Sequence, residues 1–63
     1  QRGSFIFEDT PLKEVLTCLS EYYKVSFIAD DLSKKLSGEF HTDDLDLIIT
    51  LIESALDVNI IKR

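Results

Sequence analysis

Several residue types that stabilise small domains or give them chemistry are scarce in this 63-residue chain. Its single cysteine, Cys18, excludes a disulfide within the chain and leaves no cysteine pair to anchor a zinc ion. No apolar run approaches the roughly 18 residues that a membrane span needs. The N-terminus also lacks the basic and then hydrophobic stretch of a signal peptide. We therefore expect a domain held together by side-chain packing alone.

Basic residues are scarce as well, with 7 Lys and Arg against 12 Asp and Glu, so the net charge is −5. Because phosphate binding depends on clustered Lys and Arg, this balance argues against a nucleic-acid partner. A chain of this length removes only about 60% of its surface from water on folding, so its stability is modest. The chain begins at Gln1 and ends at Arg63, directly after an apolar run. We expect residues 1–63 to be a single domain from a longer protein.

The most informative pattern in the chain is an internal repeat, in which residues 7–28 and 40–61 share an apolar frame 33 positions apart. The matched positions are Phe7 and Phe40, Leu12 and Leu45, Val15 and Ile48, Leu16 and Ile49, Leu19 and Ile52, Val25 and Val58, and Ile28 and Ile61. Polar positions such as Lys13 and Asp46 differ between the copies. The repeat therefore preserves packing and not a catalytic motif, which favours a binding module.

The first copy predicts a strand, a helix and a strand. Residues 4–7 are rich in β-formers, and residues 8–11 then interrupt them as a helix start, with Thr10 as the cap and Pro11 in the first helical position. Residues 25–29 form the next strand and residues 30–35 a connection. The helix between them has about three turns, and its apolar stripe is Leu12, Val15, Leu16, Leu19 and one of Tyr22 and Tyr23.

The second copy predicts the same order. Residues 36–41 form a strand in which Gly38 marks a bulge or a close backbone approach. The second helix begins at residues 42–44 with Asp43 as its cap, and residues 58–61 form the last strand. Leu47 and Leu51 widen the apolar face, so we expect this helix to be covered on more than one side. Its core stripe is Leu45, Ile48, Ile49, Ile52, Ala55 and Leu56.

These elements predict an α+β fold of two βαβ repeats related by a pseudo-twofold, with two helices packed against small β-sheets. Small sheets have exposed edges, and exposed edges accept strands from partners. Since the last strand has no successor, we predict that its unpaired backbone groups bind a protein partner, with Phe27 and Tyr22 as further contacts. The predicted partner-binding residues are Val58, Asn59, Ile60, Ile61, Phe27 and Tyr22.

Residues with chemical potential have simpler structural interpretations. We expect Cys18 to be a small buried hydrophobe and His41, the one imidazole, to be solvated or capping. A calcium loop beginning at Asp43 fails, because Leu45 and Leu47 fall where oxygen ligands are required. We predict no catalytic, cofactor-binding or metal-binding residue. The remaining polar candidates are interpreted as turn residues, Asp30 and Asp31, and as a solvated charge pair, Lys34 and Lys35.

The order of several segments resembles a known family, the C-terminal domain of FecR-family anti-sigma regulators, over about residues 3–61. In the first half, the segments that resemble it are Gly3-Ser4-Phe5-Ile6-Phe7-Glu8-Asp9-Thr10-Pro11-Leu12, Glu14-Val15-Leu16, Leu19, Tyr23-Lys24-Val25 and Phe27. In the second half they are Leu36-Ser37-Gly38-Glu39-Phe40, Asp44-Leu45, Ile48 and Ile52.

This resemblance implies a regulatory, non-enzymatic role in Gram-negative bacteria. The parent protein would be anchored in the inner membrane, with this domain in the periplasm and without a cofactor or a small-molecule substrate. The domain would receive a signal from the signalling domain of an outer-membrane TonB-dependent transporter, after which an extracytoplasmic-function sigma factor is released.

An alternative follows from the same resemblance, because FecR C-terminal domains are similar to the short N-terminal signalling domain of secretins and TonB-dependent transporters. The chain could then be that signalling domain itself. A membrane span upstream would favour the regulator, and a plug and barrel downstream would favour the transporter. A third possibility, a small enzyme, lacks a plausible catalytic constellation in this sequence.

Overall fold

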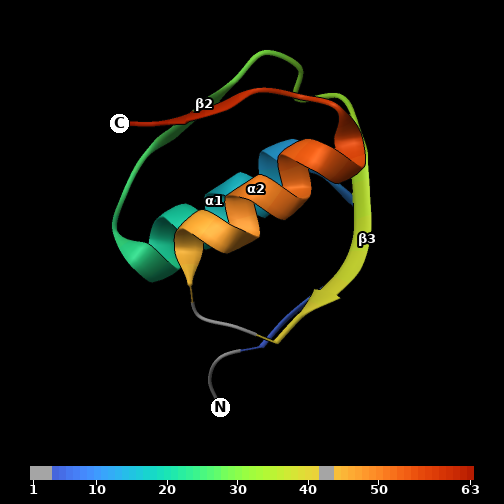
Figure 1. Cartoon of the computed structure of the whole chain (residues 1–63), viewed down its shortest axis with the longest axis horizontal. Helices are drawn as coiled ribbons and strands as arrows, with labels where there is room; N and C mark the ends of the chain where they lie inside the picture. The colour runs from blue at the N-terminus through green and yellow to red at the C-terminus, as the bar shows by residue number, and fades with distance from the viewer. Residues whose placement is uncertain (1–3, 42–43) are drawn as a thin grey trace.

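The computed structural model describes residues 4–41 and 44–63. The elements follow one another as β1 (Phe5–Pro11), α1 (Leu12–Tyr23), β2 (Phe27–Ala29), β3 (Lys35–Phe40), α2 (Leu45–Leu56) and β4 (Ile60–Lys62). The chain thus forms two successive strand-helix-strand units (Figure 1). Their strands pair into two small sheets, β1 with β3 and β2 with β4, and both sheets are antiparallel. The predicted α+β class and the predicted order of elements are confirmed.

The two helices have the same length and the same kind of ending. Each spans 12 residues, and each is followed by a residue in the left-handed backbone conformation, Lys24 at φ 62° and Asp57 at φ 56°. The N–H groups of these residues donate to the carbonyls of Ser20 and Glu53, which satisfies the last turn. Both helices therefore end in the same way, at residues that are equivalent in the repeat.

The helix starts differ from each other and from the prediction. The carboxylate of Asp44 caps α2 by accepting a hydrogen bond from the N–H of Leu47 at 3.3 Å. The predicted cap, Asp43, lies outside the described residues. No side chain caps α1, so the predicted cap Thr10 is wrong.

Thr10 does not cap α1 because it still belongs to β1. It pairs with Leu36, and its hydroxyl bonds locally to the backbone of Glu8. Pro11 also lies in the strand and precedes the helix. The first helical N–H, that of Leu12, donates instead to the carbonyl of Lys34 at 2.7 Å. The segment before β3 therefore supplies the hydrogen-bond acceptor that a capping side chain would otherwise provide.

The sheet of β1 and β3 contains an irregularity that the sequence analysis placed on the wrong strand. Phe7 pairs with Gly38 and Thr10 with Leu36, so two residues of β1, Glu8 and Asp9, oppose the single residue Ser37. Asp9 has φ 50°, and its N–H donates to the hydroxyl of Ser37 at 2.8 Å. The bulge lets β1 continue through residues 8–11, which were predicted to interrupt it.

The second sheet joins β2 to β4. Its antiparallel register pairs Phe27 with Lys62, Ile28 with Ile61, and Ala29 with Ile60. Both strands have three residues and are shorter than predicted. The predicted strands began at Val25 and Val58, and both of these residues precede the observed strands. Val58 nevertheless remains buried and belongs to the core.

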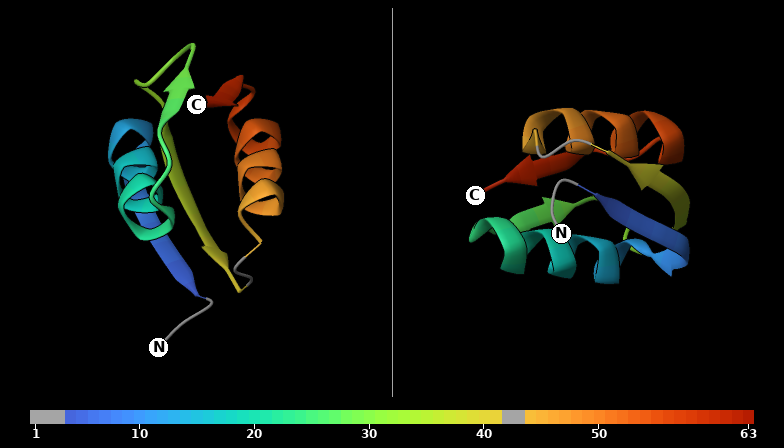
Figure 2. Two further views of the ribbon diagram at one scale, coloured as in Figure 1. Left: turned by 90° about the vertical axis from the view of Figure 1, so that its left-hand side faces the viewer. Right: turned by 90° about the horizontal axis from the view of Figure 1, so that it is seen from below.

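The two helices lie on opposite sides of the molecule, with the strands and the core between them (Figures 1 and 2). Most of the predicted stripe positions are confirmed, and Tyr23 is the tyrosine that packs against the core. The buried apolar residues are Leu12, Val15, Leu16, Leu19, Leu36, Ile48, Ile52, Val58 and Ile60.

Three predictions about helix surfaces are wrong. Cys18 and Ala55 are exposed, because each lies on the outer side of its helix. Leu47 and Leu51 were expected to lie beneath a second covering element, but they are 45% and 44% exposed. The described chain therefore leaves the outer face of α2 uncovered.

The repeat is visible in the strand pairing as well as in the helices. Phe7 pairs with Gly38, and the equivalent positions 40 and 5 also pair. In the other sheet Ile28 pairs with its own equivalent, Ile61. This is the register that a pseudo-twofold requires, and the pseudo-twofold itself stays a prediction.

Candidate partner-binding surface

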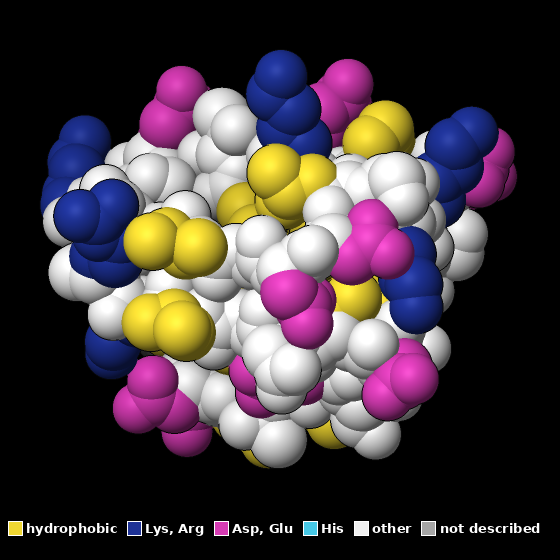
Figure 3. All heavy atoms as spheres, turned by 90° about the horizontal axis from the view of Figure 1, so that it is seen from above, with side chains coloured by type: hydrophobic (Ala, Val, Ile, Leu, Met, Phe, Trp, Pro, Cys, Tyr) yellow, Lys and Arg dark blue, Asp and Glu magenta, His cyan; other side chains and the backbone are white. Residues whose placement is uncertain are grey.

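The outer face of the β2–β4 sheet carries an apolar pair. Ile28 and Ile61 lie directly opposite each other and are 46% and 62% exposed. Strand neighbours point to the other face, so Phe27, Ala29 and Ile60 are directed to the core. Figure 3 looks onto this side of the molecule and shows hydrophobic side chains next to Lys and Arg side chains at its left. The sheet therefore presents a small apolar surface bordered by charged side chains of both signs (Figure 3).

The backbone of this sheet has two outer edges. The N–H of Asp30 donates to the carbonyl of Asn59 at 3.2 Å, and the N–H of Arg63 donates to the carbonyl of Ser26 at 2.8 Å. Antiparallel pairing alternates, so Ile28 and Ile61 also direct their backbone groups toward each other. The residues that alternate with these hydrogen-bonded positions direct their backbone N–H and C=O groups outward. We call the outward groups of Phe27 and Ala29 the β2 edge and those of Ile60 and Lys62 the β4 edge.

Two side chains of α2 contact β4, one at a backbone N–H of its edge and one at the side chain of Lys62. The N–H of Ile60 donates to Oε2 of Glu53 at 2.7 Å, and Nζ of Lys62 lies 3.3 Å from Oδ1 of Asp46. The N–H of Ile60 was expected to be unpaired, and that expectation is wrong. Among the predicted partner-binding residues of this strand segment, Val58 and Ile60 have buried side chains and Ile61 is exposed.

Asn59, another predicted contact, is engaged within the protein. Its backbone N–H and its side-chain amide donate to the two carboxylate oxygens of Asp30, each at 3.1 Å. These hydrogen bonds from Asn59 hold the pKa of Asp30 below its ordinary value, because they stabilise the charged carboxylate. The pair closes one end of the β2–β4 sheet.

A groove of about 360 Å³ lies between α1, β2 and the segment that follows β2. Its apolar part comes from Leu16, Phe27 and Leu32, and Leu32 is 43% exposed. Phe27, a predicted contact residue, is therefore half-buried in the wall of this groove. The other residues that line it are polar: Lys13, Thr17, Ser20, Glu21 and Ser26.

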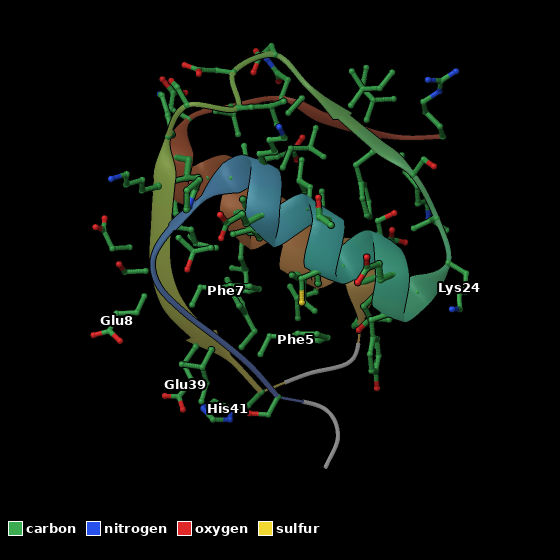
Figure 4. All side chains as sticks on the ribbon, turned by 180° about the vertical axis from the view of Figure 1, so that it is seen from behind. Phe5, Phe7, Glu8, Lys24, Glu39 and His41 are labelled. Carbon is green, nitrogen blue, oxygen red and sulfur yellow. The ribbon has the colours of Figure 1, made fainter. Side chains whose placement is uncertain are left out.

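Tyr22, the last predicted contact, belongs to an aromatic cluster that the sequence analysis missed. It meets Phe5 edge-to-face at 5.2 Å between ring centroids and Tyr23 at 4.9 Å. Phe7 stacks with Phe5 and meets Phe40. Figure 4 shows Phe5 and Phe7 pointing from β1 toward the helices. The alternation of Phe5 and Phe7 around exposed Ile6 was the pattern that could have revealed this cluster.

A family model described as FecR, C-terminal, matches residues 4–63. The chain belongs to the FecR C-terminal family. No curated protein matches it significantly, and no solved structure does. FecR proteins are anti-sigma factors, a signalling and non-enzymatic family.

The surface of this FecR domain arranges its potentially reactive groups separately. Nε2 of His41 lies 3.6 Å from Oε1 of Glu39, and both side chains are exposed (Figure 4). The prediction of a solvated His41 is confirmed. Asp31 forms a turn by accepting from the N–H and hydroxyl of Ser33, which lower the pKa of its carboxyl. Within residues 4–41 and 44–63, no three His, Cys, Asp or Glu side chains are grouped as metal ligands.

The two lysines of the FecR domain that were predicted to form a solvated pair, Lys34 and Lys35, differ in their surroundings. Lys34 was predicted to be solvated, but its Nζ donates to the carbonyl of Leu56 at the end of α2, 2.8 Å away. Lys35 lies 3.9 Å from the carboxylate of Asp9 and is exposed. Neither helix in the described part of the chain has the length and hydrophobicity that a membrane crossing requires.

Proposed function

We propose that this FecR C-terminal domain acts in the periplasm and binds the signalling domain of an outer-membrane TonB-dependent transporter. Binding regulates an extracytoplasmic-function sigma factor through a parent protein that is anchored in the inner membrane. Residues 1–63 form one domain of that parent. The role is recognition, with no catalytic step and no cofactor.

The exposed pair of Ile28 and Ile61 is the observation that supports this proposal most directly. A two-stranded sheet with an apolar outer face has edges that accept a further strand, which is a common mode of protein recognition. Partner contacts are proposed for the exposed side chain of Ile61, with Phe27 and Tyr22 as further contacts. The net charge of −5 disfavours nucleic acid as the partner.

The family match also bears on the alternative, a transporter's or secretin's own signalling domain. Because the matching family is that of FecR C-terminal domains over residues 4–63, it favours the regulator. The proposal therefore places this chain on the receiving side of the interaction.

A titration tests the proposal. The isotope-labelled domain is mixed with the signalling domain of the TonB-dependent transporter encoded beside its parent gene, and amide NMR shifts are followed. We expect saturable shifts centred on the β2–β4 sheet. Absence of saturable shifts at high concentration would contradict the proposal.

A matched pair of variants gives the titration its control. Ile61 and Ile6 are both exposed, 62% and 69%, and they lie on the outer faces of the two different sheets. Ile61→Asp is expected to weaken binding by about tenfold or more, as loss of a central apolar contact does. Ile6→Asp is expected to leave the affinity unchanged. Equal losses would remove the β2–β4 face from the proposal.

A further inference from the structure

The two edges of the β2–β4 sheet are equivalent in the repeat but differ in their side chains. At the β4 edge, Glu53 accepts from the N–H of Ile60, and Asp46 lies 3.3 Å from the ammonium of Lys62. Glu53 thus engages a backbone N–H of this edge, and Asp46 contacts the side chain of Lys62. A partner strand that added here would first have to displace a charge-assisted hydrogen bond.

At the β2 edge the bridging side chains are replaced. Subtracting 33 from each position puts Ser20 in place of Glu53, Lys13 in place of Asp46 and Ala29 in place of Lys62. Ser20 is short, and no hydrogen bond in the described residues engages the outward N–H groups of Phe27 and Ala29. The β2 edge therefore keeps its outward backbone groups available.

The groove lies along this same edge. Ser20, Phe27 and the polar residues of α1 line it, and Leu16, Phe27 and Leu32 provide its apolar surface. A strand that pairs with β2 lies about 4.8 Å from it and turns alternate side chains to one face. We infer that the partner adds an extended strand to the β2 edge, between β2 and α1, and that its alternate apolar side chains fill this groove. This inference rests on the proposed function.

The net charge of the chain favours a segment of another protein over a second copy of this chain as the occupant of the groove. Each copy carries a net charge of −5, so two copies repel each other. The groove itself has Lys13 from the first turn of α1 and Glu21 from the last. The fitting strand is apolar at alternate positions, with an acidic side chain facing Lys13 and a basic one facing Glu21.

The first test uses the wild-type domain and the neighbouring transporter's signalling domain as the probe. Amide hydrogen exchange is measured with and without the probe. New backbone hydrogen bonds at the β2 edge are expected to slow the exchange of the Phe27 and Ala29 N–H groups by about tenfold or more. The N–H groups of Ile60 and Lys62 are expected to change little. The reverse pattern would overturn the inference and leave the proposed function standing.

The second test exchanges the residues that distinguish the edges. Ser20→Glu gives α1 the side chain with which α2 occupies its edge, and it is expected to weaken probe binding by about tenfold or more. Glu53→Ser removes the acceptor at the β4 edge and is expected to leave the affinity within about twofold. A loss of binding in Glu53→Ser with none in Ser20→Glu would overturn the inference.

A third pair keeps the inference testable if Ser20→Glu does not fold. Ala29→Pro and Lys62→Pro each remove one outward N–H, at equivalent positions of the two edges. With folding checked by thermal unfolding, Ala29→Pro is expected to lose at least about tenfold in affinity and Lys62→Pro to keep it. Equal affinity of both variants for the probe would overturn strand addition at β2. No binding by the wild-type domain would instead overturn the proposed function.

Discussion

The two halves of this domain have matching elements and differ in what surrounds them. Their helices begin and end 33 positions apart, and so do β2 and β4. Yet α2 extends Glu53 and Asp46 to the sheet edge beside it, whereas α1 has Ser20 and Lys13 at those positions. Apolar positions therefore maintain the fold in both halves, while a few polar differences engage one sheet edge and leave the other open.

The outer face of α2 is more apolar than the outer face of α1. α2 exposes Leu47 and Leu51, one helical turn apart, and the equivalent residues of α1 are Glu14 and Cys18. The half whose sheet edge is occupied thus carries the more apolar helix surface. The second half therefore has the more apolar exposed helix face, and the first half has the sheet edge with available backbone groups.

Truncation of equivalent core residues is expected to have the largest effect on stability. Leu19 and Ile52 are both fully buried, so Leu19→Ala and Ile52→Ala are each expected to lower the free energy of unfolding by about 2–5 kcal/mol. Chemical denaturation measures both values. The exposed Leu51→Ala serves as the control, within about 0.5 kcal/mol of wild type. If one core variant lost less than about 1 kcal/mol, the two halves would not share the core equally.

The next largest effect concerns Glu53. Its carboxylate accepts from the N–H of Ile60 at the β4 edge, so Glu53→Ala is expected to lower the free energy of unfolding by about 1–2 kcal/mol through loss of this charge-assisted hydrogen bond. The matched variant at the equivalent position, Ser20→Ala, is expected to stay within about 0.5 kcal/mol. Equal losses in urea denaturation would show that Glu53 stabilises β4 no more than Ser20 stabilises β2.

The helix starts provide a smaller contrast. Asp44→Ala removes the side-chain cap of α2 and is expected to cost about 1 kcal/mol of stability. Thr10→Ala is expected to cost less than about 0.5 kcal/mol, because the N–H of Leu12 is bonded to Lys34 and not to Thr10. Thermal unfolding of both variants checks the difference, and a larger loss in Thr10→Ala would contradict it.

The smallest expected effect depends on pH. The hydrogen bonds from Asn59 lower the pKa of Asp30 in the folded state, so its carboxylate stabilises the fold above the ordinary pKa of 3.8. That contribution is lost as the pH falls through the lower folded-state pKa. Asp30→Ala is therefore expected to be less stable than wild type at pH 7, with the difference shrinking as the pH falls below 3.8. A constant difference between pH 7 and pH 2.5 would contradict this linkage.

Much of the fold was predictable because apolar periodicity and the repeat agree with each other. Positions such as Leu12, Leu19, Ile48 and Ile52 recur at helical spacing in both copies, and all four are buried. The predicted cap at Thr10 was wrong because a strand partner that is distant in sequence satisfies the helix start. Local propensity does not contain that information.

The candidate site was less predictable than the fold. The exposed Ile61 and the half-buried Phe27 were named, but the role of Glu53 at the β4 edge was not. An acid within a helix carries no mark in the sequence that directs it to a backbone N–H of the next strand. Comparing Glu53 with Ser20 across the repeat is what reveals the difference, and that comparison requires the strand register.

The strand pairing also determines how this chain must reach its native state. Each sheet takes one strand from the first half and one from the second, as in the pairs Phe5–Phe40 and Ile28–Ile61. Neither half can complete a ladder by itself, and every ladder closes a loop that spans about half of the chain. Folding is therefore expected to be cooperative and slower than that of a helical bundle of the same length. Cleavage between β2 and β3 would produce two fragments that regain their strands only by associating.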